Sequence, residues 1–389
     1  MDLLFSEPYA LDKAKRYEII RTIGRGAFGE VFLAWDTQMP HQSPRRRARR
    51  QRDGGAGMGG GDAEHDHELR SPGYVALKTV ASGVCAPSGR GGRGSSGVSK
   101  GLFRELRALQ MAGDCPYIVG LLDVYPEGSN AVLVLEYMPL DLAKVLDGAP
   151  CPLGEDHCKA YAGMLLKGLA WMHAHGLMHR DVKPSNLLLS AGGVLKIADF
   201  GQTRTRTVPQ TRSYSHQVAT RWYRAPELLY GTRRYGFAVD MWAAGAVVGE
   251  MLAGRPLFPG RSDIDQLHKI LQVVTGSPTE ATWPGAKDLP DYDKVCFAEL
   301  PAQEASVVFQ GSSQEACDFT MGLLHLDPQN RSSALEALQH SFFLVAPAAA
   351  PCHLLLPRKA YTPSADSSGG ERPAKLGAAF LDEGFGFGA

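Results

Sequence analysis

The sequence is poor in the features that mark secreted and membrane proteins. Its 7 cysteines are odd in number, and no two of them form a Cys-x-x-Cys pair. This argues against a disulfide framework or a zinc site and favours a reducing compartment. No apolar stretch reaches the roughly 18 residues of a membrane span, and the early run Leu3-Leu4-Phe5 is too short for a signal peptide. With Asp2 in place of a myristoylatable glycine and no C-terminal prenylation signal, we expect a cytosolic or nuclear chain without a membrane anchor.

The chain also lacks a net charge, because its 41 basic residues match its 41 acidic ones. The balance hides a local contrast, since residues 41–101 carry 11 Lys or Arg against 5 Asp or Glu, together with 14 of the 44 glycines. Six of the eight residues in 45–52 are arginine. Segments of this composition cannot build a core. We therefore expect flexible inserts at about 37–72 and 82–99 within a mildly acidic globular body.

Hydrophobic periodicity divides the chain into a strand-rich first part and a mainly helical second part. Short β-branched runs predict a hairpin over 17–35 and strands over 74–80, 118–124 and 131–137, with one helix over 100–111. Longer helical patterns follow at 155–175, 240–253, 314–324 and 333–338. Residues 344–389, rich in Pro, Ala and Ser, are expected to be unstructured. The pattern predicts an α+β fold.

A glycine pattern lies inside the predicted hairpin, at Gly24, Gly26 and Gly29, followed by Val31. Glycine lets a backbone approach phosphate oxygens because no Cβ stands in the way. A dinucleotide-binding turn needs a helix after the glycines, whereas here a strand follows. The pattern favours a strand–turn–strand flap over phosphates, and a plain glycine turn remains the alternative.

A lysine and a glutamate upstream of the helical part could form a phosphate-binding pair. Lys78 ends the apolar strand Val75-Ala76-Leu77, and Glu105 lies on the following predicted helix. A strand lysine can hold ATP phosphates when a carboxylate positions it. The alternatives are a lysine that reaches the surface and a glutamate on a solvated helix face.

The residues with the clearest chemistry are clustered in the second part. The motif His179-Arg180-Asp181-Val182-Lys183-Pro184-Ser185-Asn186 is followed by Asp199-Phe200-Gly201 and then by Ala225-Pro226-Glu227. Phosphoryl transfer needs charge and positioning more than covalent help. Asp181 would accept the proton of a substrate hydroxyl, and Lys183 would neutralise charge on the transferred group. Asn186 and Asp199 supply the oxygen ligands that Mg²⁺ prefers.

Taken in this order, these motifs resemble the protein kinase family over Tyr17–Phe343. The resemblance implies a bilobal fold, with an extension at 1–16, an N-lobe over 17–138 and a C-lobe over 139–343, and with ATP and Mg²⁺ in the cleft. It implies that Leu135 is the gatekeeper and that the backbone of Glu136 to Met138 meets adenine. Asp240 and Arg331 match positions that brace the catalytic loop and the Glu227 carboxylate.

Two further stretches resemble the cyclin-dependent kinase group: ATRWYRAPELLYG at 219–231 and the large-lobe insert at 255–284. This likeness implies protein substrates with Ser or Thr before Pro. Within the group, 289–300 and the runs around Asp181 and Ser215 are similar to the cell cycle-related kinase branch. That branch is associated with the length of cilia and flagella, acting through MAP-kinase-related kinases. On this basis we expect the chain in the cytoplasm, with the nucleus and the base of the cilium or flagellum as further sites.

Three departures from the group stand out. The helix reads SKGLFRE instead of the cyclin-binding signature, which argues against a cyclin partner. Ala27 and Phe28 replace the phosphorylatable pair of some relatives, which excludes inhibitory phosphorylation there. Gln202 stands where leucine is usual; a tolerated surface change and a destabilised inactive state are both open.

Ser215 aligns with the group's activating threonine, between Asp199 and Glu227. The resemblance implies that Arg104, Arg180 and Arg204 surround a phosphate on Ser215. Such a phosphate adds about −1.5 to −2 charge, which the arginines can pair. An upstream activating kinase is thereby implied, with a constitutively ordered loop as the alternative. Thr220 matches the threonine that bridges Asp181 and Lys183.

The sequence is interpreted as an active Ser/Thr protein kinase that uses ATP and Mg²⁺. One alternative is a pseudokinase scaffold, which the presence of Lys78, Glu105, Asp181, Asn186 and Asp199 disfavours. The other is a partner-binding protein that uses the arginine run at 45–52. A solvated spacer is the favoured interpretation of that run, ahead of nucleic-acid binding, a nuclear signal or an acidic partner.

Overall fold

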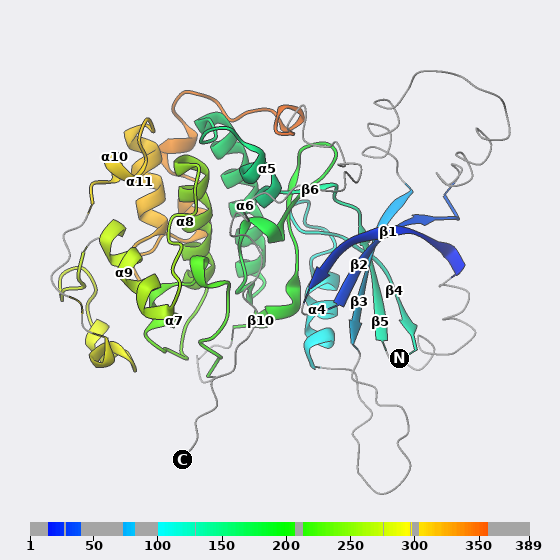
Figure 1. The fold of residues 1–389 in the computed structure, drawn as a ribbon, viewed down its shortest axis with the longest axis horizontal. Helices are drawn as coiled ribbons and strands as arrows, with labels where there is room; N and C mark the ends of the chain where they lie inside the picture. Colours follow the sequence, from blue (N-terminus) through cyan, green and yellow to red (C-terminus); the bar gives the residue numbers. More distant parts are fainter. Residues whose placement is uncertain are drawn as a thin grey trace, which may run out of the picture.

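The computed structural model describes residues 15–26, 29–39, 73–81, 100–128, 130–206, 213–274, 276–295, 297 and 303–356. Two lobes lie side by side, a sheet with one helix and a larger, mainly helical body (Figure 1). The expected inserts lie almost wholly outside the described residues, as do Ala27 and Phe28. None of the described helices is both long and apolar enough to cross a membrane.

The smaller lobe is a five-stranded antiparallel sheet with the order β1-β2-β3-β5-β4. The strands are β1 (Tyr17–Gly26), β2 (Gly29–Asp36), β3 (Tyr74–Ala81), β4 (Leu121–Glu127) and β5 (Asn130–Glu136). The β1–β2 hairpin agrees with the prediction over 17–35. A short apolar core that includes Val75, Leu77 and Val134 lies on one face, as alternation along a half-buried strand requires.

The prediction of a strand over 118–124 was wrong at its start. Ile118 makes an isolated parallel bridge to Ile197 in the other lobe, and β4 begins three residues later, at Leu121. Both Ile118 and Val119 are buried. Their apolar run therefore belongs to a junction between the lobes, and a short apolar run alone cannot distinguish that from a strand.

The helix α4 (Lys100–Met111) packs beside the sheet and agrees with the predicted helix. Leu102, Glu105, Ala108 and Leu109 face inward, at the three- and four-residue spacing of one helix face. The buried Glu105 is thereby aimed at the space between sheet and helical lobe.

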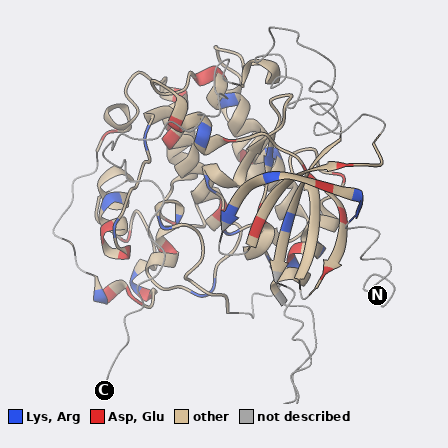
Figure 2. Cartoon of the chain, turned by 45° about the vertical axis from the view of Figure 1, so that its right-hand side comes forward, with Lys and Arg blue, Asp and Glu red and all other residues tan. Residues whose placement is uncertain are grey.

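The larger lobe is built around two long helices, α6 (Glu155–Ala174) and α8 (Ala238–Ala253). Every residue of α8 from Val239 to Leu252 is buried, as expected for a helix apolar on all sides. Around them stand α5 (Leu142–Gly148), α7 (Pro226–Leu229), α9 (Asp263–Val274), α10 (Ala305–Val308), α11 (Gln314–Leu323) and α12 (Ala334–Ala337). Basic and acidic residues are interspersed over both lobes in the described part (Figure 2).

Short strands carry the catalytic motifs on the side of this lobe that faces the sheet. They are β6 (Leu140–Asp141), β7 (Leu177–Met178), β8 (Leu187–Leu189), β9 (Leu195–Ile197) and β10 (Arg204–Thr205). β6, β8 and β9 pair in that order, and β10 pairs with β7. The segments before and after β8 and β9 are thereby fixed against each other.

The expectation that residues 344–389 are unstructured was wrong for residues 344–356. The ammonium of Lys159, buried on α6, donates to the carbonyls of Val345 at 2.7 Å and Pro347 at 2.8 Å. The hydroxyl of Tyr161 donates to the carbonyl of Leu355, which is itself buried. Alanine and proline supply the apolar surface and backbone carbonyls that this packing uses, so their abundance did not mean disorder.

Candidate active site

The β1–β2 hairpin brings the predicted phosphate flap to the open edge between the lobes. Gly24 pairs with Val31, and Gly26 with Gly29. Gly29 has φ of +135°, and a Cβ there would lie 1.8 Å from the carbonyl oxygen of Thr79. Only glycine fits this position, because the flap crosses the neighbouring strand at backbone distance.

Lys78 joins the two lobes through two ion pairs. Its Nζ lies 2.7 Å from Glu105 Oε1 on α4 and 2.9 Å from Asp199 Oδ1 in the helical lobe. Burial lowers the pKa of Lys78, but the two carboxylates outweigh it, so the net effect is a raised pKa. Burial raises the pKa of Asp199, yet the charge of Lys78 leaves it below its ordinary value. Lys78 and Asp199 are therefore charged together at neutral pH.

The catalytic loop holds Asp181 by both carboxylate oxygens. Oδ1 accepts from the backbone N–H of Thr220 at 3.1 Å and from its hydroxyl at 3.2 Å. Oδ2 lies 3.0 Å from both Asn186 Nδ2 and Lys183 Nζ. Lys183 Nζ also donates to the Thr220 hydroxyl at 2.9 Å. The four residues named as catalytic from the sequence are thus brought into one hydrogen-bonded group.

Asp240 fixes the backbone of this loop. Its carboxylate accepts from the N–H groups of His179 at 2.9 Å and Arg180 at 2.7 Å, and it lies 3.0 Å from His173 Nε2. Burial raises the pKa of Asp240, but the bonds from His173 and the backbone keep it below its usual range. Arg180 has φ of +69°, a strained geometry for a non-glycine residue. The hydrogen bonds to the buried Asp240 carboxylate stabilise this strained backbone conformation.

The metal ligands named from the sequence fit Mg²⁺. Asn186 points its amide nitrogen at Asp181, which leaves the amide oxygen for a cation, and Lys78 occupies only Oδ1 of Asp199. Within the described ranges no group of three His, Cys, Asp or Glu side chains could hold a metal alone. Mg²⁺ is commonly bound by one or two carboxylates and completed by phosphate oxygens, which agrees with this sparse donor set.

The hinge residues lie at the end of β5. Leu135 pairs with Ala76 and with Leu121, and Glu136 pairs with Val75. The carboxylate of Glu136 accepts from the N–H of Gly120 at 2.7 Å and pairs with Lys196 at 2.6 Å. Sequence reasoning missed Lys196, because no sequence motif marks a lysine in the middle of the short strand β9. The side chain of Glu136 is thereby engaged by Gly120 and Lys196.

Arg104, Arg180 and Arg204, named from the resemblance, act on one another electrostatically. Burial, with repulsion from Arg180 and Arg104, lowers the pKa of Arg204 to about 10. Arg180 donates to the Gln202 carbonyl at 2.8 Å and to the Tyr235 hydroxyl at 2.8 Å, and Tyr235 donates to the Ser215 carbonyl. Ser215 itself is exposed. Sequence reasoning missed Tyr235, which no local pattern distinguishes from a core tyrosine.

The segment after Ser215 contains a third missed residue, Arg224. Its guanidinium donates to the carbonyls of Val218 at 2.9 Å and Ala219 at 3.1 Å. Ala219 has φ of +62°, so its backbone is left-handed and its carbonyl does not point as it would in an extended strand. Gln202, the departure noted above, accepts from the Ala219 N–H at 3.4 Å, so its side chain is not merely a surface feature.

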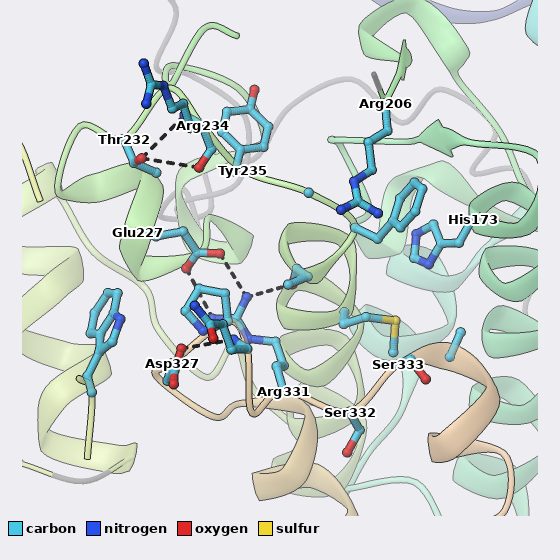
Figure 3. A pocket seen from close by; sticks show the side chains of 18 of the residues that line it. His173, Arg206, Glu227, Thr232, Arg234, Tyr235, Asp327, Arg331, Ser332 and Ser333 are labelled. Carbon is cyan, nitrogen blue, oxygen red and sulfur yellow. Dashed lines mark hydrogen bonds and ion pairs between the residues drawn. The ribbon is translucent and has the colours of Figure 1, made fainter. Parts of the chain in front are cut away.

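A cavity of about 630 Å³ lies in the helical lobe, away from these catalytic residues (Figure 3). Its wall contains the buried ion pair of Arg331 and Glu227, at 2.9 Å, the brace that the resemblance implied. It also contains His173, Tyr235 and Arg206. Lys78, Asp181 and Asp199 do not line it.

Comparisons with known proteins agree with the geometry. A family model described as "Protein kinase domain" matches residues 68–343. A rat (Rattus norvegicus) protein named cyclin-dependent kinase 20 is 45% identical over 286 residues, 73% of this chain and 80% of that protein. Cyclin-dependent kinase 7 of Xenopus laevis is 41% identical over 343 residues, 88% of this chain and 85% of that protein. A solved structure titled "Structure of the CAK complex form Chaetomium thermophilum bound to ATP-gamma-S" matches with TM-score 0.71 and 30% identity, over 90% of this chain and 98% of that one.

Proposed function

Since the chain belongs to the protein kinase family and, within it, to the cyclin-dependent kinase group, we propose that it phosphorylates serine or threonine directly before proline. It is an ATP-dependent Ser/Thr protein kinase that uses ATP and Mg²⁺. The order of the motifs and their convergence around Lys78 and Asp181 disfavour a pseudokinase scaffold.

The observation that carries the proline preference is the engagement of the Ala219 carbonyl by Arg224. A backbone carbonyl that already accepts from a guanidinium is a poor acceptor for the N–H of a substrate residue. A substrate N–H buried there without a partner would cost about 1–3 kcal/mol. Proline has no N–H and avoids that cost, so it is favoured directly after the phosphorylated residue.

The geometry supports specific roles for the chain's own groups. Asp181 accepts the proton of the substrate hydroxyl, and Lys183 offsets negative charge on the transferred phosphoryl group. Lys78, held by Glu105, orients the phosphates of ATP. Bound Mg²⁺, held by Asp199 and Asn186, would neutralise phosphate charge. Thr220 holds Asp181 and Lys183 in register through its hydroxyl.

The test is transfer of labelled γ-phosphate to two peptides that differ only in Ser-Pro against Ser-Ala. We expect at least tenfold higher kcat/KM on the Ser-Pro peptide, and none on either with Asp199→Ala. Equal rates on both peptides would refute proline direction. If wild type and Asp199→Ala are equally inactive, even after treatment with an upstream kinase, the scaffold alternative holds.

We propose that phosphorylation of Ser215 by an upstream kinase activates the chain. Burial, and after it repulsion from Arg180 and Arg104, lowers the pKa of Arg204, and a phosphate would offset the repulsion. A cyclin is not required in this proposal. Its support is that the residues of one chain make the Lys78–Glu105 pair and that α4 lacks the cyclin-binding signature. Robust activity only after addition of a cyclin would contradict it.

The cellular role is proposed on the resemblance to the cell cycle-related kinase branch alone. We infer a cytoplasmic kinase, present also in the nucleus or at the base of the cilium or flagellum, that limits organelle length through a MAP-kinase-related substrate. Imaging of the tagged chain, with organelle length measured after its loss, tests this. Unchanged length would remove the role without touching the catalytic assignment.

A further inference from the structure

The 630 Å³ cavity in the helical lobe is large enough for two aromatic side chains. Its apolar walls include Phe237 and Met241 near the start of α8, and Trp283 and Leu289 from the segment after α9. It does not belong to the ATP site, and the catalytic roles above leave it unused.

The acidic side chains that line the cavity are already engaged by other groups. Glu227 is paired with Arg331, and Asp327 accepts from Asn330 at 2.8 Å and from the N–H of Gln329 at 2.9 Å. Arg206 and Arg234 also line the cavity, and both are exposed (Figure 3). Among the described residues neither arginine has a carboxylate within ion-pair distance; Arg206 lies only over the Phe237 ring, at 5.1 Å. The cavity therefore suits a segment with aromatic and acidic side chains.

The sequence of this chain contains such a segment. Residues 380–387 read FLDEGFGF, with three aromatic and two acidic residues and no basic one. They lie among residues 357–389, outside the described part. We propose that Phe385 and Phe387 of this segment dock into the cavity of the same chain, with Asp382 and Glu383 facing Arg206 and Arg234.

The reach of the chain permits this docking. Leu355 is fixed to Tyr161 on α6, and the cavity is lined by Ala170 and Ala174 on the same helix. At 1.5 Å per residue these points lie roughly 20 Å apart along the helix axis. A random coil of about 24 residues, the number between Leu356 and Phe380, would have a root-mean-square span of roughly 25–30 Å. Docking within one chain would then take place at an effective concentration of order mM, and a weak site would suffice.

Docking would touch two residues that hold the active site. Tyr235 lines the cavity while its hydroxyl binds the Ser215 carbonyl, and His173 lines it while bonded to Asp240. An occupied cavity would restrict the motion of both rings. The inference does not depend on proline direction or on activation at Ser215.

Hydrogen exchange on the full chain tests the proposal. We expect amides in 232–241 and 283–289 to exchange several-fold faster in the double variant Phe385→Ser/Phe387→Ser than in wild type. The matched control is Tyr361→Ser, which removes an aromatic residue from the same region and should leave exchange unchanged. Identical exchange in wild type and double variant would overturn the proposal.

A charge exchange and a peptide separate docking in cis from other occupants. Arg234→Glu should raise exchange in the same amides, and adding Asp382→Arg/Glu383→Arg should restore protection. A synthetic peptide of residues 378–389 should bind the double variant at least tenfold more tightly than wild type, because the chain's own segment competes. Equal affinity for both chains would overturn docking in cis and assign the cavity to a segment of another molecule.

Discussion

The phenolic oxygen of Tyr235 lies 2.5 Å from the backbone carbonyl oxygen of Ser215. The same oxygen accepts from Arg180 at 2.8 Å, so one hydroxyl joins the activation segment to the catalytic loop. The tie uses the backbone carbonyl of Ser215, so it needs no phosphate on the side chain and should support basal activity.

Removing this hydroxyl should slow the unphosphorylated enzyme. In Tyr235→Phe, Arg180 and the Ser215 carbonyl each lose a partner, at about 1 kcal/mol per hydrogen bond. We expect kcat/KM on a Ser-Pro peptide to fall about five- to tenfold, and less after phosphorylation of Ser215. Tyr125→Phe, a buried tyrosine of the sheet stacked on Tyr17, is the control and should be unchanged. An unaltered rate in Tyr235→Phe would show that the tie does not matter for turnover.

How far the sequence predicts this site depends on how local its signals are. Asp181, Asn186 and Asp199 stand in contiguous motifs whose chemistry is recognisable from spacing. Tyr235 and Lys196 act through partners far away in the chain, and their type and neighbours resemble those of ordinary core or strand residues. Only the three-dimensional structure shows such pairs.

The fold shows the same division. The helices over 100–111 and 155–174 were predicted almost to the residue, since a long amphipathic period is a strong signal. Segment 344–356 was misread because its order depends on Lys159 and Gly193 elsewhere. A Cβ on Gly193 would lie 1.8 Å from the Cys352 carbonyl. Composition carries no information about such contacts.

Phosphorylation of Ser215 should control activity. Ser215→Ala is expected to lower kcat by tenfold or more after treatment with an upstream kinase, because no phosphate can offset the three arginines. Ser213→Ala changes an exposed serine of the same segment and should behave as wild type. Turnover numbers from initial rates decide; an unchanged kcat for Ser215→Ala refutes the switch.

The proline preference should depend on Arg224. In Arg224→Gln the Ala219 carbonyl loses its guanidinium partner, so the Ser-Pro to Ser-Ala ratio of kcat/KM should fall about three- to tenfold, the scale of one hydrogen bond. Arg221→Gln is the matched control, because Arg221 also pairs with Asp263 but donates to the carbonyl of Arg261 instead. A ratio that falls equally in both variants would assign the effect to Asp263.

The ion pair of Lys78 and Asp199 should stabilise the fold within a defined pH window. The pKa of Asp199 is lowered on folding, so its contribution is present above about pH 4 and is lost as pH falls further. The pKa of Lys78 is raised, so its contribution is present below about pH 10 and is lost only as pH rises beyond that.

Chemical unfolding of wild type and Asp199→Asn across this range tests the window. We expect a difference in the free energy of unfolding of about 2 kcal/mol between pH 5 and 9, the scale of a hydrogen bond to a charged group, shrinking towards pH 3. Asp114→Asn, which changes an exposed carboxylate, should show little difference at any pH. A constant difference down to pH 3 would mean that the charge of Asp199 is not what stabilises the fold.

Lys159 should stabilise the packed C-terminal segment. In Lys159→Met the carbonyls of Val345 and Pro347 lose a charged donor, which costs about 2–4 kcal/mol, so the melting temperature should drop by roughly 5–10 °C. Lys167→Met, which removes an exposed lysine from the same helix, should shift it little. If both variants melt alike, the segment adds nothing to stability.

The same ammonium defines where the folding unit ends. The family match stops at Phe343, but a chain cut there would remove the carbonyls that accept from Lys159 and Tyr161. The uncompensated charge would favour opening of α6 at its first turns, next to Leu153 and the C-terminal end of α8. The packed unit therefore extends at least to Leu355, twelve residues past the end of the family match.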